Sequence, residues 1–184
     1  MDIDSRLARL TDGVSPPRRN RLRHLGRLGG VLVLVAGLVM PTAVFAANEL
    51  PDAAALAARL DAKPTMPAIV LVSLPGCAIC EIVRREQLAP LLRDPAYRDI
   101  GVFEISMRDE VSRLPLRGEW AGAADEGMAT PAQLSRFLGL RMAPTVLFIN
   151  RQAVLAEPLI GYPSRDFYWS FLSERIGTAR QHSR

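Results

Sequence analysis

The sequence predicts a single α/β domain built on a sheet of mixed strand direction. Three observations predict this fold class. Segments with helical and with strand periodicity alternate along most of the chain. Residues 68–74 form a nearly continuous apolar run, which is typical of a central strand buried on both faces. Residues 144–149 and 153–160 both have the pattern of strands and follow each other closely, with a turn at Asn150-Arg151 between them. The predicted order of elements is αβαβαββα.

The first four elements lie before residue 108. Residues 52–60 are Ala-rich and predict a helix, and the strand at 68–74 ends at Pro75-Gly76. Apolar residues then recur at helical spacing from Cys77 to Leu92, which predicts a helix that begins where that strand ends. Residues 101–107 alternate in polarity and predict a second strand.

A less regular segment precedes the next helix. Residues 108–130 are rich in turn-forming residues and predict a surface insertion, in which Trp120 alternatively contacts a partner. Thr130-Pro131 has the pattern of a helix N-cap followed by proline at the first helical position, and the helix is expected to run to Leu138. Pro158 indicates that the last strand lies at an edge or contains a bulge.

The last predicted helix spans residues 166–176 and is rich in aromatic residues. Phe167 and Phe171 are four residues apart, so we expect both to face the sheet. Tyr162 and Trp169 belong to the same aromatic group, and their alternative role is to dock a peptide, because exposed aromatic side chains are favoured as interface anchors.

The excess positive charge of the chain is confined to its first quarter. The 184-residue chain has a formal net charge of +4. Residues 1–46 contain seven arginines and three aspartates, whereas the remaining 138 residues carry 16 basic and 16 acidic side chains. Because this larger part has no excess of basic residues, no nucleic-acid partner is expected.

Residues 1–46 have the composition of an export signal. A basic region from Arg18 to Arg27 precedes 20 uncharged residues, and Val44-Phe45-Ala46 matches a signal-peptidase site. The alternative to cleavage after Ala46 is an uncleaved membrane anchor, because 20 uncharged residues can span a bilayer. In both cases the arginines before the apolar run direct residues 47–184, the predicted folded domain, to the far side of the membrane.

The two cysteines of the chain, Cys77 and Cys80, would lie in a compartment that favours oxidation. A disulfide across two intervening residues closes so short a loop that it adds little stability. A zinc site needs about four ligands, and the two histidines, His24 in the leader and His182 in the tail, leave it without partners. We therefore expect no metal and no cofactor, and redox chemistry is the remaining interpretation.

The position of the cysteines supports this interpretation. Cys77 lies at a strand-to-helix junction, where free N–H groups and the helix dipole stabilise a thiolate and lower its pKa. Cys80 lies one turn further along, close enough to attack a mixed disulfide formed at Cys77. The sequence thus predicts Cys77 as the catalytic nucleophile and Cys80 as the catalytic resolving thiol.

Two motifs, Pro75-Gly-Cys-Ala-Ile-Cys80 and Met142-Ala-Pro-Thr-Val-Leu-Phe148, give residues 50–177 a resemblance to the thioredoxin superfamily. The resemblance implies a thioredoxin-like fold, with a central mixed sheet flanked by helices. It also implies that Pro144 is a cis proline beside the cysteines and that Ala143 and Pro144 bind substrate. The ending Gly161-Tyr-Pro-Ser-Arg-Asp-Phe-Tyr-Trp169 is similar to that of SoxS-type periplasmic thioredoxins, which are associated with bacterial sulfur oxidation.

The chain departs from the thioredoxin pattern near the cysteines. Leu71 stands where a typical thioredoxin has a buried acid, so proton transfer at Cys80 has to use water, Glu81 or another group. Ala78-Ile79 adds no charge that would stabilise the thiolate, which favours a reductant. Arg84 is expected on a solvated helix face, and its alternative role is to lower the thiolate pKa.

These observations predict a periplasmic thiol-disulfide oxidoreductase that reduces protein disulfides and is recycled by an electron-donating redox partner, soluble or membrane-bound. The resemblance extends this prediction to a link with sulfur oxidation. Two alternatives stay open: a disulfide-forming oxidase or isomerase, and a redox-inactive regulatory binding module. If the leader is retained, the domain is anchored to the inner membrane and faces the periplasm.

Overall fold

The computed structural model describes residues 49–183. The predicted signal peptide or anchor over residues 1–46, together with cleavage after Ala46, lies outside the described residues. Within residues 49–183, no helix combines the length and the apolar character that a membrane span requires.

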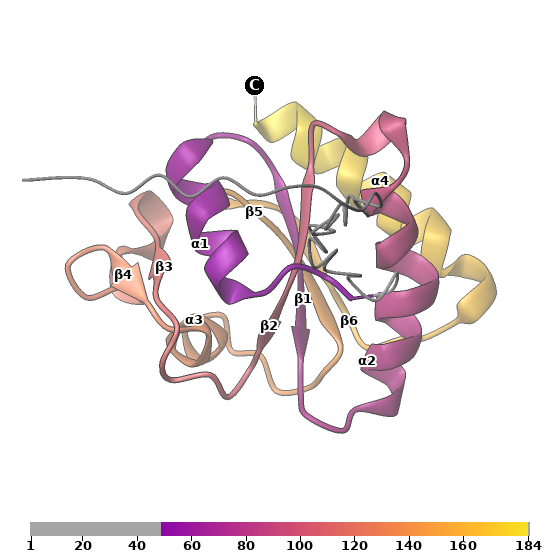
Figure 1. Cartoon of the computed structure of the whole chain (residues 1–184), viewed down its shortest axis with the longest axis horizontal. Coiled ribbons are helices and arrows are strands. Elements are labelled where there is room, and N and C mark those ends of the chain that lie inside the picture. The colour runs from indigo at the N-terminus through magenta and orange to yellow at the C-terminus, as the bar shows by residue number, and fades with distance from the viewer. Residues whose placement is uncertain (1–48, 184) are drawn as a thin grey trace, which may run out of the picture. The chain divides into compact units, whose positions relative to one another are not determined.

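The centre of the molecule is a four-stranded sheet in the order β2-β1-β5-β6 (Figure 1). Strand β1 (Ala68–Ser73) pairs in parallel with β2 (Gly101–Ser106). Strand β5 (Thr145–Ile149) runs antiparallel to both β1 and β6 (Val154–Ile160). The predicted mixed sheet is therefore confirmed.

The position of each strand in the sheet follows from its residues. All six residues of β1 and all five of β5 are buried, as expected for central strands with both faces covered. Strand β6 contains Pro158, lies at the edge, and pairs with β5 through a register shift near Phe148. A proline that cannot donate a ladder hydrogen bond is tolerated at such a position.

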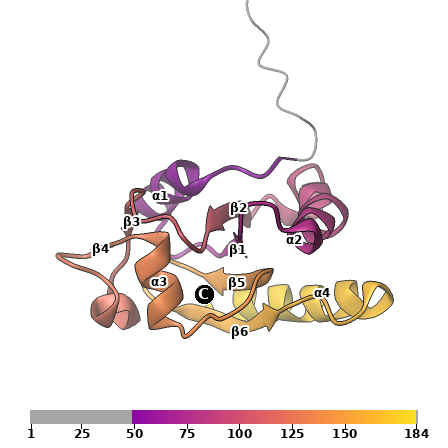
Figure 2. The ribbon, with the colours of Figure 1, turned by 90° about the horizontal axis from the view of Figure 1, so that it is seen from below.

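Helices cover both faces of the sheet (Figure 2). Helices α1 (Ala53–Ala62) and α3 (Pro131–Phe137) lie on one face, and α2 (Ala78–Ile82) and α4 (Arg165–His182) lie on the other. Helix α2 continues through a π-helical segment, Val83–Leu88, and a 3₁₀ segment, Ala89–Leu92.

The strands feed two separate apolar clusters, one on each face of the sheet. The cluster under α1 and α3 takes Val70 and Val72 of β1 together with Leu56 of α1. The cluster under α2 and α4 takes Leu71 of β1 and Leu172 of α4. Successive side chains of β1 thus point to opposite faces and pack against both layers of helices. This arrangement is the thioredoxin-like fold.

The structure corrects the prediction for residues 108–130. This segment forms a two-stranded sheet of β3 (Leu114–Pro115) and β4 (Met128–Ala129), with the 3₁₀ helix Gly118–Gly122 between them. Trp120 has no exposed surface, and its indole N–H donates to the carbonyl oxygen of Asn150 at 3.2 Å. Because Trp120 belongs to the cluster under α1 and α3, it is a core residue and not a partner contact.

Helix α3 begins as predicted. The Thr130 side chain accepts a hydrogen bond from the backbone N–H of Gln133, and the Gln133 side chain accepts one from the N–H of Thr130. This reciprocal pair is a capping box, with Pro131 at the first helical position.

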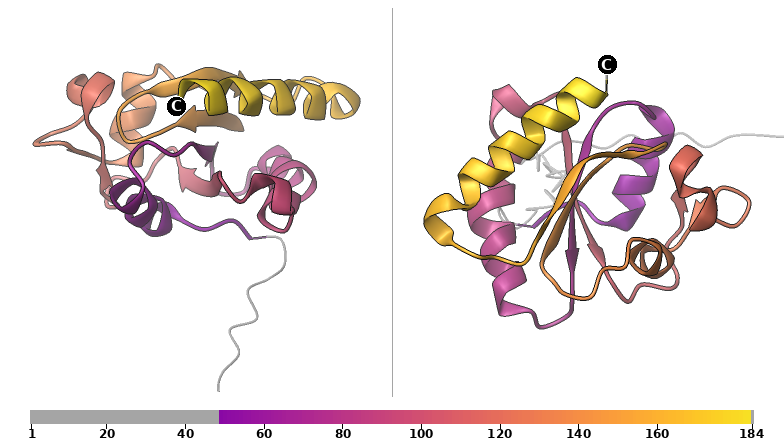
Figure 3. Two further views of the ribbon diagram at one scale, coloured as in Figure 1. Left: turned by 90° about the horizontal axis from the view of Figure 1, so that it is seen from above. Right: turned by 180° about the vertical axis from the view of Figure 1, so that it is seen from behind.

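Helix α4 is rotated relative to the predicted orientation. Its buried side chains are Tyr168, Leu172, Ile176 and Ala179, which recur at helical spacing. Phe167 and Phe171 are 64% and 42% exposed, so the expectation that they face the sheet is wrong. Figure 3 shows α4 lying along the sheet, where it packs against β6.

Candidate redox site

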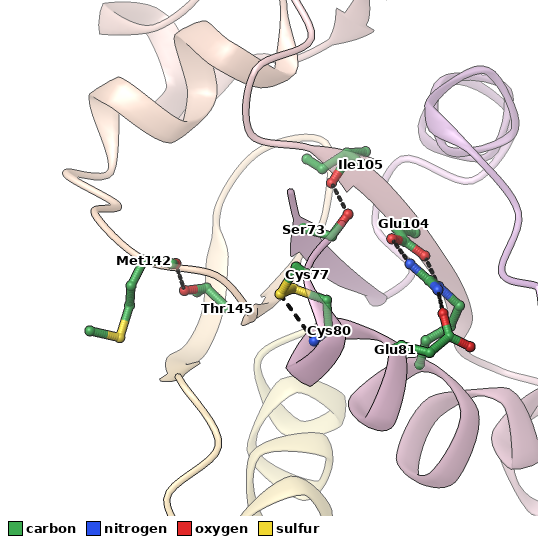
Figure 4. Close-up of a disulfide and its surroundings, with 9 residues drawn as sticks. Ser73, Cys77, Cys80, Glu81, Glu104, Ile105, Met142 and Thr145 are labelled. Atoms are coloured by element: carbon green, nitrogen blue, oxygen red, sulfur yellow. Dashed lines mark hydrogen bonds and ion pairs between the residues drawn. A yellow bond between two sulfur atoms is a disulfide. The ribbon is translucent and has the colours of Figure 1, made fainter. Parts of the chain in front are cut away.

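The two cysteines meet at the end of β1. Pro75-Gly76 turns the chain out of the sheet, with Gly76 at a φ of +74°, a conformation that glycine adopts without strain. Cys77 is the N-cap of α2, and its sulfur forms a disulfide with Cys80. The Cys77 sulfur also accepts the backbone N–H of Cys80 at 3.1 Å (Figure 4).

The two sulfur-bearing residues differ in exposure. Cys77 is partly exposed at the start of the helix, whereas Cys80 lies on the face of α2 that points into the core and has no exposed surface. A disulfide of another protein can therefore reach Cys77 directly. It can reach Cys80 only if the chain moves.

The loop before β5 lies at the same end of the sheet. Thr145 pairs with Val72 near the end of β1, so Pro144 comes to the level of the cysteine turn. The Ala143–Pro144 peptide bond is cis. The Thr145 hydroxyl donates to the Met142 carbonyl at 2.9 Å and closes the loop beside the disulfide (Figure 4). Pro144 is buried and Ala143 half-buried.

A pocket of about 350 Å³ opens beside Cys77, between α2 and β2. Its wall combines the cysteine turn with polar side chains from β1, from β2 and from the helical segment that follows Cys77. The polar side chains are Ser73, Glu81, Arg84, Glu104 and Ser106. The partly exposed Cys77 therefore shares this pocket with charged side chains.

Arg84 holds two carboxylates in this pocket. Its Nε and Nη2 atoms donate to the two oxygens of Glu104 at 2.5 and 2.6 Å, and its Nη1 donates to Glu81. The hydrogen bonds to Glu104 raise the pKa of the Arg84 guanidinium, and the nearby charges of Glu104, Glu81 and Glu49 add to this effect. Arg84 is therefore neither a freely solvated side chain nor a free cation beside the thiol.

Glu104 is the functional candidate that the sequence analysis missed. It pairs with Leu71 across β1 and β2, so it lies next to the position where the thioredoxin pattern has its buried acid. Leu71 itself is fully buried. The available signal was the single acid in the alternating strand 101–107, because a carboxylate on a half-buried strand needs a partner.

The exposed apolar side chains near the site belong to the turn and the loop. Ile79, between the two cysteines, is 44% exposed, and Met142, before the cis peptide, is 53% exposed. Tyr162 packs against Tyr168 with ring centroids 4.9 Å apart. The rings of Trp169 and Tyr97 pack in a T-shaped arrangement with centroids 6.2 Å apart. A peptide-docking role for Tyr162 or Trp169 stays a prediction.

Residues 49–183 contain no cluster of three His, Cys, Asp or Glu side chains placed to hold a metal ion.

No protein-family model and no curated protein matches the chain. Among solved structures, it is similar to thioredoxin f from spinach chloroplast, at 15% identity over 73% of this chain and 88% of that one, with a TM-score of 0.47. It is also similar to the periplasmic thioredoxin SoxS from Paracoccus pantotrophus, at 23% identity over 61% and 98% of the two chains, with a TM-score of 0.42. A third similarity, to Trxlp from Edwardsiella tarda, has 20% identity over 62% and 88% and a TM-score of 0.42.

Proposed function

We propose that this protein is a thiol-disulfide oxidoreductase that reduces disulfides in other proteins. The observation that carries the proposal is the Cys77–Cys80 disulfide at a helix N-terminus, with Cys77 partly exposed and Cys80 buried. The Cys77 sulfur is thus accessible to a substrate, whereas the Cys80 sulfur is shielded from it. The short loop adds little stability, so a structural role does not account for the bond.

The reaction transfers two electrons from the dithiol to the substrate. The Cys77 thiolate attacks one sulfur of the substrate disulfide, forming a mixed disulfide and releasing the other substrate sulfur as a thiolate. The Cys80 thiolate then attacks the Cys77 sulfur, which forms the Cys77–Cys80 disulfide and releases the second substrate thiolate. The two protons lost by the enzyme thiols pass, through solvent, to the two substrate thiolates.

The loop before β5 is the proposed binding site for the substrate chain. Ala143 and Pro144 lie at the end of the sheet that carries the cysteine turn, and Ile79 and Met142 offer exposed apolar surface there. A substrate peptide would lie along this loop with its disulfide against Cys77.

Each turnover leaves the enzyme oxidised, so the cycle needs an electron-donating redox partner.

The direction of the reaction rests on the residues between the cysteines. Ala78 and Ile79 add no positive charge that would stabilise the thiolate and make the pair a strong oxidant. The disulfide-forming alternative predicts a reduction potential near that of strong oxidants, about −120 mV, instead of a more negative value.

The finer part of the proposal is that the enzyme acts in the periplasm and serves a sulfur-oxidising system. Its support is the export-like composition of residues 1–46 and the ending at 161–169, which is similar to that of SoxS-type thioredoxins. Replacing Cys80 with Ser in the full chain, and identifying the proteins trapped on Cys77 in the native periplasm, tests this part. Trapped proteins without any role in sulfur oxidation would contradict it.

Insulin reduction with a small dithiol as electron donor tests the activity itself. The wild-type protein should accelerate the precipitation of insulin chains, and the Cys77→Ser variant should match the uncatalysed rate. A wild-type rate equal to the uncatalysed rate, in a folded protein whose cysteines form and break the disulfide, would favour the regulatory binding module.

A further inference from the structure

The charged group in the pocket beside Cys77 contains one more negative than positive charge. We call Glu81, Arg84 and Glu104 the carboxylate clamp. Both oxygens of Glu104 bind the guanidinium, and Glu81 binds its remaining terminal nitrogen. The single cation thus shares its charge between two carboxylates, all within the wall that Cys77 also lines.

The clamp joins the helix of the cysteines to the sheet. Glu81 and Arg84 follow Cys80 along the helical segment, whereas Glu104 comes from β2, 20 residues beyond Arg84 in the sequence. The side chains of Arg84 and Glu104 are only 22% and 17% exposed, so water screens their charges less than those of surface side chains. Glu81 is 47% exposed.

We infer that Glu104 is a positioning residue that makes the dithiol a better reductant. Glu104 pairs with the Arg84 guanidinium as its counter-ion and leaves the pocket with a net negative charge. This inference rests on the proposed oxidoreductase function and assigns the residue that adjusts the strength of the reductant.

The sign follows from the charge of the thiolate. A negative pocket disfavours a thiolate at Cys77, so it raises the free energy of the reduced state but not that of the uncharged disulfide. A dithiol that is less stable relative to its disulfide donates electrons more readily. The helix N-terminus and the Cys80 N–H act in the opposite direction and favour the thiolate.

Other charged groups surround this region without entering the pocket wall. Glu49 contributes a further negative charge near Arg84. Arg108, after β2, and Arg141, before the cis peptide, are exposed, and neither lines the pocket in the described part of the chain. The clamp is therefore the charged group whose removal should affect the sulfur most.

Opposite substitutions in the same ion pair provide the test. Glu104→Gln removes one negative charge from the clamp, and Arg84→Gln removes its positive charge. Both disrupt the hydrogen bonds between Arg84 and Glu104, and Arg84→Gln also removes the bond to Glu81, so a structural role predicts shifts of the same sign. The charge effect predicts opposite signs. Glu157→Gln is the matched control, because Glu157 pairs with Arg175 outside the pocket.

The measurements are the thiolate titration of Cys77 in the reduced protein and the equilibrium of the Cys77–Cys80 pair with a glutathione redox buffer. Glu104→Gln should stabilise the thiolate and shift the equilibrium constant about fivefold towards the dithiol, the order expected for one charge at a partly exposed pocket. Arg84→Gln should shift both quantities the other way, and Glu157→Gln should leave them unchanged.

Glu81→Gln keeps the inference testable if Arg84→Gln does not fold. Glu81 is half-exposed, so its loss should spare the fold, and it should shift both quantities in the direction of Glu104→Gln. Circular dichroism verifies the fold of each variant. Shifts of the same sign for Glu104→Gln and Arg84→Gln, or no shift for Glu104→Gln and Glu81→Gln, overturn the inference. Both measurements are independent of insulin reduction, so they distinguish this failure from failure of the proposed function.

Discussion

On β1 and β2, the face of the sheet under α1 and α3 is apolar, whereas the face under α2 becomes polar beside the disulfide. Phe103 and Ile105 of β2 belong to the first face. On the second face, Glu104 and Ser106 follow Val102 and line the pocket next to Cys77. The first face thus stabilises the fold through apolar packing. The second face has charged and polar side chains in place of apolar ones beside the reactive sulfur.

The largest expected effect comes from the cysteines on the polar side. Cys77→Ser should abolish disulfide reduction, because the sulfur within reach of substrate is lost. Cys80→Ser should accumulate mixed disulfides, because no thiol remains to resolve them. Non-reducing electrophoresis with a disulfide substrate measures both outcomes.

Alkylation of the reduced wild-type protein provides the control for this assignment. Cys77 should react first at mildly acidic pH and should titrate below the value of an ordinary thiol, about 8.5. Faster modification of Cys80 would contradict the assigned roles. The functional difference between the two faces of the sheet would then not hold.

The next effect tests the apolar side through Trp120. Trp120→Ala should lower the free energy of unfolding by about 3–5 kcal/mol, because it leaves a large cavity in the cluster under α1 and α3. Trp169→Ala, on the partly exposed face of α4, should cost much less. Urea unfolding measures both values. The redox equilibrium of the Trp120 variant should stay at the wild-type value, and a shift would show that the two faces are not independent.

A smaller effect on the same side concerns the start of α3. Thr130→Ala removes the side chain that accepts the Gln133 N–H, and it should cost about 1 kcal/mol. Thr130→Ser retains the cap and should recover most of this loss. Thermal unfolding of the two variants gives the comparison, and equal destabilisation by both would show that the hydroxyl does not carry the effect.

The sequence predicts the parts of the molecule that depend on local patterns. The cysteine turn, the capping box at Thr130 and the central strand 68–74 are each defined by residues close together in the chain. Trp120 was misplaced because turn-forming neighbours indicate a loop but do not say which side chain of that loop enters the core. Phe167 and Phe171 were misplaced because Tyr168 and Leu172 offer the same spacing one residue later.

In the candidate site, too, the residues defined by local patterns were predicted and those brought together by the fold were not. Cys77 and Cys80 were found because their spacing and helix-start position are local signals. The clamp was not found, since Glu104 reaches Arg84 only through the parallel register of β1 and β2, which pairs Leu71 with Glu104. A single sequence contains no direct signal for that pairing.

The smallest expected effect concerns a second ion pair on the side of α2 and α4. Arg180 of α4 donates from Nε and Nη2 to the two oxygens of Asp99, at 2.8 and 2.7 Å. These hydrogen bonds lower the pKa of Asp99 below its ordinary value. A carboxyl group whose pKa is lower in the folded state stabilises the fold above its unfolded pKa and loses this contribution as pH falls through the folded value.

Asp99→Asn should therefore lower the free energy of unfolding at neutral pH, by less than about 1 kcal/mol because the pair is exposed to solvent. The difference from wild type should shrink as the pH falls below about 3.9, the ordinary value for aspartate. Urea unfolding at neutral and at strongly acidic pH measures it. In an Arg180→Gln background the same substitution should have little effect at either pH. A difference that persists unchanged in acid would show that Asp99 acts through packing, and the polar side of the molecule would then owe its pH dependence to other groups.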